Sequence, residues 1–147
     1  MNGTEKATFV NQVFDTIAGD YDRMNRLMTW GMLPMWQARV MRHTDLPVGG
    51  RGLDVCCGTG EMAFQMAKLA GPYGESVGVD FSDEMLAAAA EKQKIRGIAN
   101  VTFKKGDALA LPVSTGSFDA ATCGYALRNV TDIPQAIRQM ARAVRPG

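Results

Sequence analysis

Apolar residues near the start of the chain recur three or four positions apart, which is the spacing of one helix face. They are Phe9, Val10, Val13, Phe14 and Ile17. This pattern predicts an amphipathic helix that ends near Gly19. The next stretch, residues 23–43, is dense in Met and Trp and predicts two short helices broken at Gly31 and Pro34. Its Met and Trp stripe either packs against the domain or forms an adaptable apolar cover over an apolar substrate.

From residue 46 onward, strand-like and helix-like stretches alternate. The strand-like runs are 52–57, 76–81, 101–106 and 118–125, and the helix-like runs are 60–70, 82–97 and 132–145. Strands that alternate with helices form βαβ units with right-handed crossovers, so the sequence predicts an α/β fold with a parallel sheet. The connection 107–117 has the composition of a loop. We therefore expect an N-terminal helical cover over residues 1–45 and an α/β domain over residues 46–147.

Composition narrows the range of partners. Sixteen Lys and Arg stand against fifteen Asp and Glu, a net charge of +1, so no overall field favours nucleic acid. The chain shows neither an apolar leader nor a run of about 18 apolar residues, which favours a cytoplasmic protein. Cys56, Cys57 and Cys123 lack C-x-x-C spacing. We expect them to pack as small apolar residues, and we expect no metal site.

The stretch "LDVCCGTGEMAF", residues 53–64, leads a strand through two glycines into a helix. The backbone N–H groups at the start of that helix, near Gly60, should face the crevice beyond the sheet. The turn also satisfies the pattern G-x-G-x-x-A, and Asp80 follows Gly60 by twenty residues. That interval is typical of the ribose-binding acid of dinucleotide enzymes, so a nicotinamide- or flavin-dependent oxidoreductase is one alternative.

Acidic residues around this turn favour a different ligand. Asp54 lies just before the two glycines, and Glu61 opens the helix where a pyrophosphate would lie. Like charges would repel there, whereas both carboxylates suit a ligand with an amino group or a sulfonium centre, such as S-adenosylmethionine. Asp80 ends the second strand, where it can accept from both hydroxyls of a ribose. Asp107 follows the third strand and can accept from an adenine amino group, while the N–H of Ala108 donates to the ring.

Several longer stretches carry a more specific resemblance. They are "LDVCCGTGEMA", "GVDFSDEML", "GDALALP" and "GYALRNVTD", with "FDTIAGDYDRMN" upstream. Together they resemble the menaquinone/ubiquinone biosynthesis C-methyltransferase family, within the class I S-adenosylmethionine-dependent methyltransferases, over nearly the whole chain. The resemblance implies a Rossmann-like sheet and S-adenosyl-L-methionine as the cofactor. The residues that it assigns to the cofactor are Tyr21, Asp54, Gly58, Thr59, Gly60, Asp80, Phe81, Met85, Asp107, Ala108 and Gly124.

The same resemblance implies how these residues share the cofactor. The glycine turn with Asp54 holds the methionine part, and Tyr21 reaches that end from the cover. Gly124 lies near the sulfonium, whereas Met85 lies against the adenine.

The implied reaction transfers a methyl group to a ring carbon of a reduced prenylated quinone, as in the conversion of demethylmenaquinol to menaquinol. A ring hydroxyl must first lose a proton, and a phenol with a pKa near 10 in water needs a base or a group that stabilises the phenolate. Arg128 and Asn129, after the fourth strand, are weak candidates for this chemistry. His43, the only histidine, is a third, and no residue is assigned as the base.

The resemblance also bears on the end of the chain. Family members continue past "ARAVRPG" with three further strands, so we expect a sheet truncated after the strand 118–125. That strand would then be an edge able to pair with a second chain, which favours a homo-oligomer. We expect weak cofactor binding, little methyl transfer, and at most peripheral membrane contact through the substrate. A catalytically incompetent S-adenosylmethionine-binding module is therefore an alternative to an enzyme.

Overall fold

The computed structural model describes residues 3–124 and 126–147 of the chain. Its elements, in order, are α1 (Gly3–Ile17), α2 (Tyr21–Met28), α3 (Leu33–Arg42), β1 (Arg51–Val55), α4 (Glu61–Ala70), β2 (Glu75–Asp80), α5 (Asp83–Arg96), β3 (Val101–Lys105), β4 (Ala120–Thr122), the short 3-10 helix η1 (Leu127–Asn129) and α6 (Ile133–Ala143). Below, residues 3–42 are called the cover and residues 46–147 the body.

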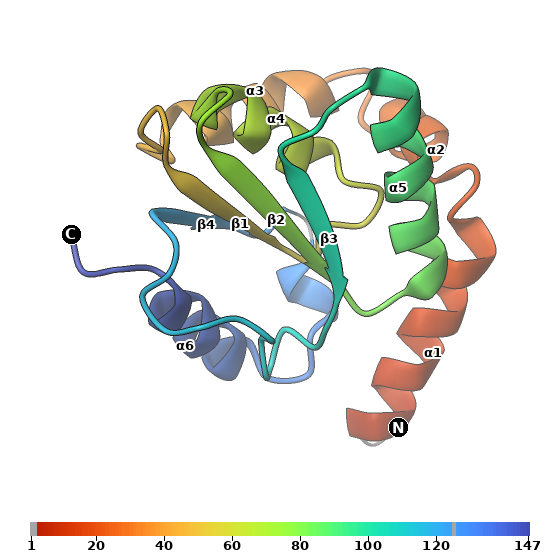
Figure 1. Ribbon diagram of the computed structural model, residues 1–147. Coiled ribbons are helices and arrows are strands. Elements are labelled where there is room, and N and C mark those ends of the chain that lie inside the picture. The colour runs from red at the N-terminus through yellow and green to blue at the C-terminus, as the bar shows by residue number, and fades with distance from the viewer. Residues whose placement is uncertain (1–2, 125) are drawn as a thin grey trace.

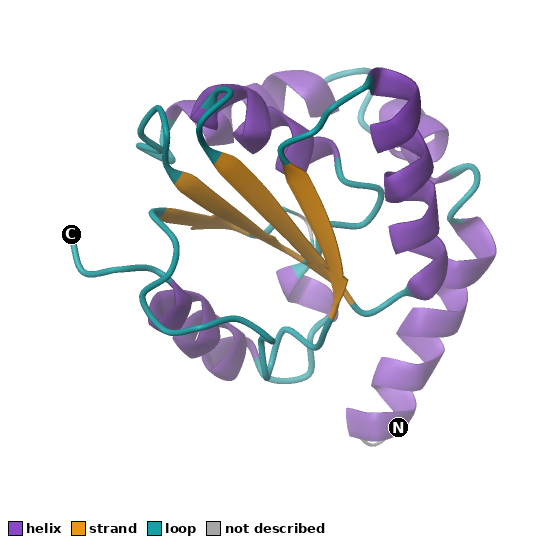
Figure 2. Cartoon of the chain, in the orientation of Figure 1, coloured by secondary structure: helices purple, strands orange, loops and turns teal. Residues whose placement is uncertain are grey.

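The described strands form one parallel sheet in the order β3-β2-β1-β4 (Figure 1). In its register, Leu53 of β1 lies opposite Val77 of β2 and Ala121 of β4. Helices separate consecutive strands, except between β3 and β4, where the predicted loop 107–117 contains no helix (Figure 2). The predicted α/β fold with a parallel sheet is therefore confirmed.

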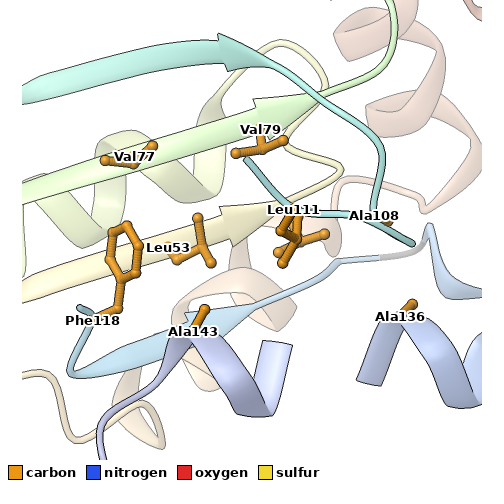
Figure 3. Close-up of a cluster of buried hydrophobic side chains, with 9 residues drawn as sticks. Leu53, Val77, Val79, Ala108, Leu111, Phe118, Ala136 and Ala143 are labelled. Atoms are coloured by element: carbon orange, nitrogen blue, oxygen red, sulfur yellow. The ribbon is translucent and has the colours of Figure 1, made fainter. Parts of the chain in front are cut away.

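Side chains that alternate along β1 and β2 build the main core. Leu53, Val77 and Val79 point to the face that α6 covers, and Val55 belongs to the same cluster. They pack there against Phe118 and Leu111, and against small residues of α6 such as Ala136 and Ala143 (Figure 3). Because each of these strand residues is less than 5% exposed, this face contributes a large share of the hydrophobic stabilisation.

The opposite face of the sheet carries small or polar residues and packs against α4, with α3 and α5 on the same side (Figure 1). Ser76 of β2 donates a hydrogen bond to the backbone carbonyl of Ala63 in α4 at 2.6 Å. Thr122 of β4 approaches Sδ of Met66 at 3.6 Å. Buried hydroxyls on this face are therefore paired, as buried polar groups must be.

The observed boundaries correct parts of the sequence prediction. Gly31, with a φ of 75°, separates α2 from α3 as predicted. Pro34 was wrongly predicted to break a helix: it lies in the first turn of α3, where the missing N–H costs no intrahelical bond. The predicted strand 118–125 is shorter than expected, because β4 covers only Ala120–Thr122. Its last predicted residue, Tyr125, lies outside the described residues.

The cover contacts the body along α5 and α4. Helix α1 runs beside α5, and α3 packs on α4 (Figure 1). Neither α1 nor α2 contains a buried residue among those described, and α3 buries only Met41. The cover therefore gains little stability from apolar burial compared with the body.

Candidate functional site

A tight turn joins β1 to α4 at the carboxyl end of the sheet. Gly58 and Gly60 have φ angles of 53° and 90°, in the left-handed region that glycine enters without steric cost. At Gly60 a Cβ atom would lie 2.7 Å from Cζ of Phe103, so a larger residue would displace that ring. The turn brings the backbone close to the space beyond the strands, where ligands bind in parallel α/β sheets.

Asp80, the last residue of β2, holds this turn. Its Oδ2 accepts a hydrogen bond from the Gly58 N–H at 2.8 Å, and its Oδ1 accepts from the Ser82 N–H at 2.9 Å. Burial raises the pKa of Asp80 above its ordinary value, and these N–H groups oppose the rise. A carboxylate oxygen has two lone pairs, so each oxygen can accept one more hydrogen bond. Asp80 is therefore both fixed in place and able to bind a ligand.

A pocket of about 530 Å³ opens beside this turn, between the body and the cover. Its volume falls in the range of small-molecule and cofactor sites. The loops after all four strands contribute to its wall, together with α1 and α2. The pocket brings together most residues expected from the sequence: Tyr21, Gly58, Asp80, Phe81, Met85, Asp107, Ala108, Arg128 and Asn129.

Tyr21 lies across the turn from the cover side. Its Cε1 is 3.7 Å from the position that a Cβ of Gly58 would occupy, and its ring meets Phe14 edge to face, with centroids 5.7 Å apart. Burial raises the pKa of the Tyr21 hydroxyl. The hydroxyl therefore stays protonated at neutral pH and can act as a hydrogen-bond donor.

One wall of the pocket was not anticipated from the sequence. It consists of the apolar face of α1, with Phe9, Val10, Val13, Phe14 and Ile17. The helical spacing of these residues was visible in the sequence, but nothing there indicated what the face meets. From the Met and Trp stripe, Met24 and Met28 reach the pocket, whereas Trp30 is 93% exposed.

Asp54 lies behind the turn, outside the pocket lining. Its side chain is buried, and its Oδ1 accepts a hydrogen bond from the Thr122 hydroxyl at 2.7 Å. Burial raises the pKa of Asp54 to about 7; the Thr122 hydrogen bond lowers it, and the charge of Asp80 adds to the rise. Burial therefore favours the neutral form of this acid, whereas a positive charge nearby would favour the carboxylate.

Other expected residues also lie outside the described pocket lining: Thr59, Gly60, Gly124 and His43. Thr59 is buried and donates to Asp22 of the cover. A Cβ on Gly124 would lie 2.5 Å from Sδ of Met62, which places this glycine against α4. His43 caps the end of α3, where its backbone N–H donates to Val40.

Glu61 does not face the pocket, which corrects one argument made from the sequence. Its carboxylate accepts from Lys92 at 2.7 Å and from Arg96 at 2.8 Å. Burial tends to raise the pKa of Glu61, but hydrogen bonds from Arg96 and Lys92 outweigh it and lower that pKa. Because these cations neutralise Glu61, its charge is no argument against a phosphate ligand. Asp80 and Asp107 are acids of the pocket lining, and Asp54 lies outside that lining.

The three cysteines are free thiols. Cys57 is buried, and Cys56 reaches the pocket wall. A hydrogen bond with Cys123 and burial raise the pKa of the Cys56 thiol, and burial raises that of Cys57. Both therefore stay protonated and unreactive at neutral pH, which suits packing residues.

Within the described part of the chain, no helix combines the length and apolar character that a membrane crossing requires.

The chain is similar in sequence to known methyltransferases. The chain is 45% identical to the 2-phytyl-1,4-naphtoquinone methyltransferase of Synechocystis sp. over 94% of its length, and spans 58% of that relative. It is 42% identical to the demethylmenaquinone methyltransferase of Geobacillus kaustophilus, again over 94% of its length and 59% of the relative. The chain thus spans less than two thirds of either.

A solved structure has the same fold. A SAM-dependent methyltransferase of Aquifex aeolicus superposes with a TM-score of 0.69 at 23% identity, over 75% of this chain and 58% of that one. The model of the ubiE/COQ5 methyltransferase family matches residues 1–147. The chain therefore belongs to the ubiE/COQ5 methyltransferase family.

Proposed function

We propose that the pocket binds S-adenosyl-L-methionine, with the ribose on Asp80. The observation that carries this proposal is the Asp80 carboxylate, which lines the pocket while the N–H groups of Gly58 and Ser82 fix its orientation. A carboxylate held in this way can accept from two neighbouring hydroxyls without losing side-chain freedom on binding. The glycine turn leaves room for the ligand beside it, and the site therefore fits an adenosyl group.

The remaining pocket residues divide between the two ends of this ligand. Met85, Asp107 and Ala108 line the part expected to take the adenine, with Phe81 nearby. Tyr21 and Gly58 line the part expected to take the methionine. Asp54, Thr59, Gly60 and Gly124 lie outside the described lining. We propose that Thr59 and Gly60 shape the turn, that Asp54 adds negative charge beneath the cationic end of the ligand, and that Gly124 lies near the sulfonium.

We further propose that this chain serves the C-methylation of a reduced prenylated quinone, demethylmenaquinol being the expected substrate. The names of the two relatives support a naphthoquinone-type ring. The apolar wall of α1 supports an apolar substrate, because a prenyl chain gains about 0.8 kcal/mol for each buried CH₂ group. When bound, S-adenosyl-L-methionine would supply an electrophilic methyl group.

The chain's own contribution to this reaction is to hold the ring and its charge. Arg128 and Asn129 line the pocket, so a guanidinium and an amide are available to stabilise a phenolate. His43 lies outside the lining and caps α3, which removes support for it as the base. The pocket walls also restrict the motion of the ring, and such positioning can supply roughly 7 to 11 kcal/mol.

The expected location is the cytoplasm, with membrane contact only where an apolar substrate is collected.

A homo-oligomer formed through β4, the last strand of the sheet order, remains part of the proposal. Sedimentation of the chain at several concentrations tests it, and a monomer throughout would refute it.

Isothermal titration calorimetry with S-adenosyl-L-methionine and, separately, with NAD tests the cofactor. We expect binding of the first and none of the second. Incubation with a demethylmenaquinol analogue and methyl-labelled cofactor then tests transfer. Cofactor binding without labelled product would identify a binding module rather than an enzyme, and NAD binding alone would favour an oxidoreductase.

A further inference from the structure

Just outside the pocket, one lysine joins the cover to the body. Nζ of Lys92, on α5, donates to Oδ2 of Asp22 at 2.5 Å, to Oε1 of Glu61 at 2.7 Å and to Oγ1 of Thr59 at 2.9 Å. Asp22 belongs to α2, Thr59 to the glycine turn and Glu61 to the first turn of α4. A single ammonium group therefore bonds three separate segments. We call these four residues the Lys92 junction.

Asp22 has both carboxylate oxygens engaged in this junction. While Oδ2 accepts from Lys92, Oδ1 accepts from the Thr59 hydroxyl at 2.5 Å. Thr59 stands between Gly58 and Gly60 and is only 4% exposed. The cover therefore bonds directly to the turn that forms the pocket floor.

The charges of the junction balance and are partly shielded from water. Arg96 pairs with Glu61, so two cations face the two carboxylates of Asp22 and Glu61. The side chains of Lys92, Asp22 and Glu61 are 20%, 36% and 31% exposed. Removing one partner of a partly buried, hydrogen-bonded ion pair lowers stability more than removing one partner of an exposed pair.

The junction holds the first turn of α2, which carries Tyr21. Asp22 directly follows Tyr21, so the two side chains leave the same helical turn in different directions. Tyr21 lines the pocket above Gly58, whereas Asp22, Thr59, Glu61 and Lys92 all lie outside the described lining. Since α2 has no buried residue, apolar burial does little to hold it, and polar bonds must do so.

We propose that Lys92 and Asp22 are positioning residues that hold Tyr21 across the cofactor pocket and link closure of the cover to the glycine turn. This inference rests on the proposed cofactor site. It predicts that a residue which does not line the pocket controls how long the ligand stays bound. By linkage, a ligand that orders the turn also stabilises the cover.

The test uses Lys92→Met, which keeps the aliphatic stem and removes the charge, and Asp22→Asn, which keeps the shape of the acid. Lys94→Met is the matched control, because Lys94 is an exposed lysine on the same helix. Two properties are measured for each chain: hydrogen exchange of the α2 amides without ligand, and the affinity and dissociation rate of S-adenosylhomocysteine. Exchange of the β1 and β2 amides reports whether the body is folded.

We expect Lys92→Met and Asp22→Asn each to speed exchange of α2 by about tenfold and to weaken ligand binding by about tenfold, mainly through faster dissociation. Combining them should add little to either alone, because both break one junction. Lys92→Arg should restore part of the affinity, since it keeps the charge. Lys94→Met should change neither property.

Unchanged α2 exchange in Lys92→Met and Asp22→Asn, with the body folded, would overturn the proposal. An equal effect of Lys94→Met would overturn it as well. If Lys92→Met does not fold, Asp22→Asn decides alone, because it changes only the cover side. Absence of ligand binding in the unchanged chain would refute the cofactor site instead, and exchange of α2 would still test the junction.

Discussion

Leu53, in the body, is fully buried between strands and α6, whereas Leu27, in the cover, keeps 79% of its surface exposed. The body is held by apolar side chains that alternate along parallel strands, as Val55 and Val79 do. The cover buries few apolar side chains, Met41 of α3 being one, and polar contacts such as Lys92 with Asp22 also tie it to the body. Regions with little apolar burial open at a lower free-energy cost. The proposed cofactor pocket therefore lies between a stable wall and one that can move, as ligand entry requires.

The largest expected effect concerns the buried carboxyl of the body. In the unfolded chain Asp54 ionises near its ordinary pKa of 3.8, whereas burial raises its pKa in the folded chain to about 7. Below pH 3.8 both states are protonated and the contribution to stability is fully present. As the pH rises toward 7 only the unfolded state ionises, so the free energy of unfolding falls, by on the order of 4 kcal/mol in total.

Asp54→Asn removes this titration and should flatten the pH dependence. Urea unfolding near pH 4 and near pH 8 measures it, and the variant should gain stability relative to the unchanged chain as the pH rises. The pKa of Asp80 is also raised by burial. The free energy of unfolding of Asp54→Asn should therefore still fall with rising pH, but less than that of the unchanged chain. The matched control is Asp83→Asn, because the Asp83 side chain is 71% exposed. Parallel pH profiles for all three chains would contradict the prediction.

A somewhat smaller effect is expected from the two leucines. Leu53→Ala leaves a cavity in the core and should lower the free energy of unfolding by about 3 kcal/mol. Leu27→Ala removes an exposed side chain and should change it by no more than about 0.5 kcal/mol. Urea unfolding of both variants gives the comparison, and similar losses would show that the cover contributes to the core after all.

The smallest expected effect comes from weakening a polar contact between the cover and the body. Asp15 of α1 accepts a hydrogen bond from the Ser82 hydroxyl. Asp15→Asn should lower the global free energy of unfolding by less than about 1 kcal/mol, because the pair is partly exposed. It should nevertheless speed hydrogen exchange in α1. Asp20→Asn, at an exposed position of the cover, is the control. If hydrogen exchange in α1 is unchanged in Asp15→Asn, polar contacts are not what mainly keeps the cover on the body.

Much of the body could be predicted because local patterns there match the fold. Apolar runs before Asp80 and before Gly58 indicated buried strands. The interval between the glycine turn and Asp80 indicated that both lie at the same edge of the sheet. The structure places both at the pocket. Loop composition likewise identified the connection 107–117. Each of these features depends on neighbouring residues, which the sequence displays.

What the sequence missed depends on partners far along the chain. Asp54 was correctly predicted to lie in a strand, but the sequence did not show that its carboxylate pairs with Thr122, 68 residues away, outside the described pocket lining. Glu61 was expected to face the ligand, yet Lys92, 31 residues away, pairs with it. No local sequence pattern indicates the contact between Lys92 and Asp22, because 70 residues separate them in the chain.

The central claim is that the pocket binds an adenosyl ligand through Asp80, and calorimetric titration of S-adenosyl-L-methionine into the unchanged chain and into Asp80→Ala tests it most directly. Loss of two charge-assisted hydrogen bonds should weaken binding by on the order of 3 kcal/mol, roughly a hundredfold. Asp83→Ala, three residues away and exposed, should bind as the unchanged chain does, and circular dichroism checks that each variant is folded. A dissociation constant that stays the same in folded Asp80→Ala would contradict the account.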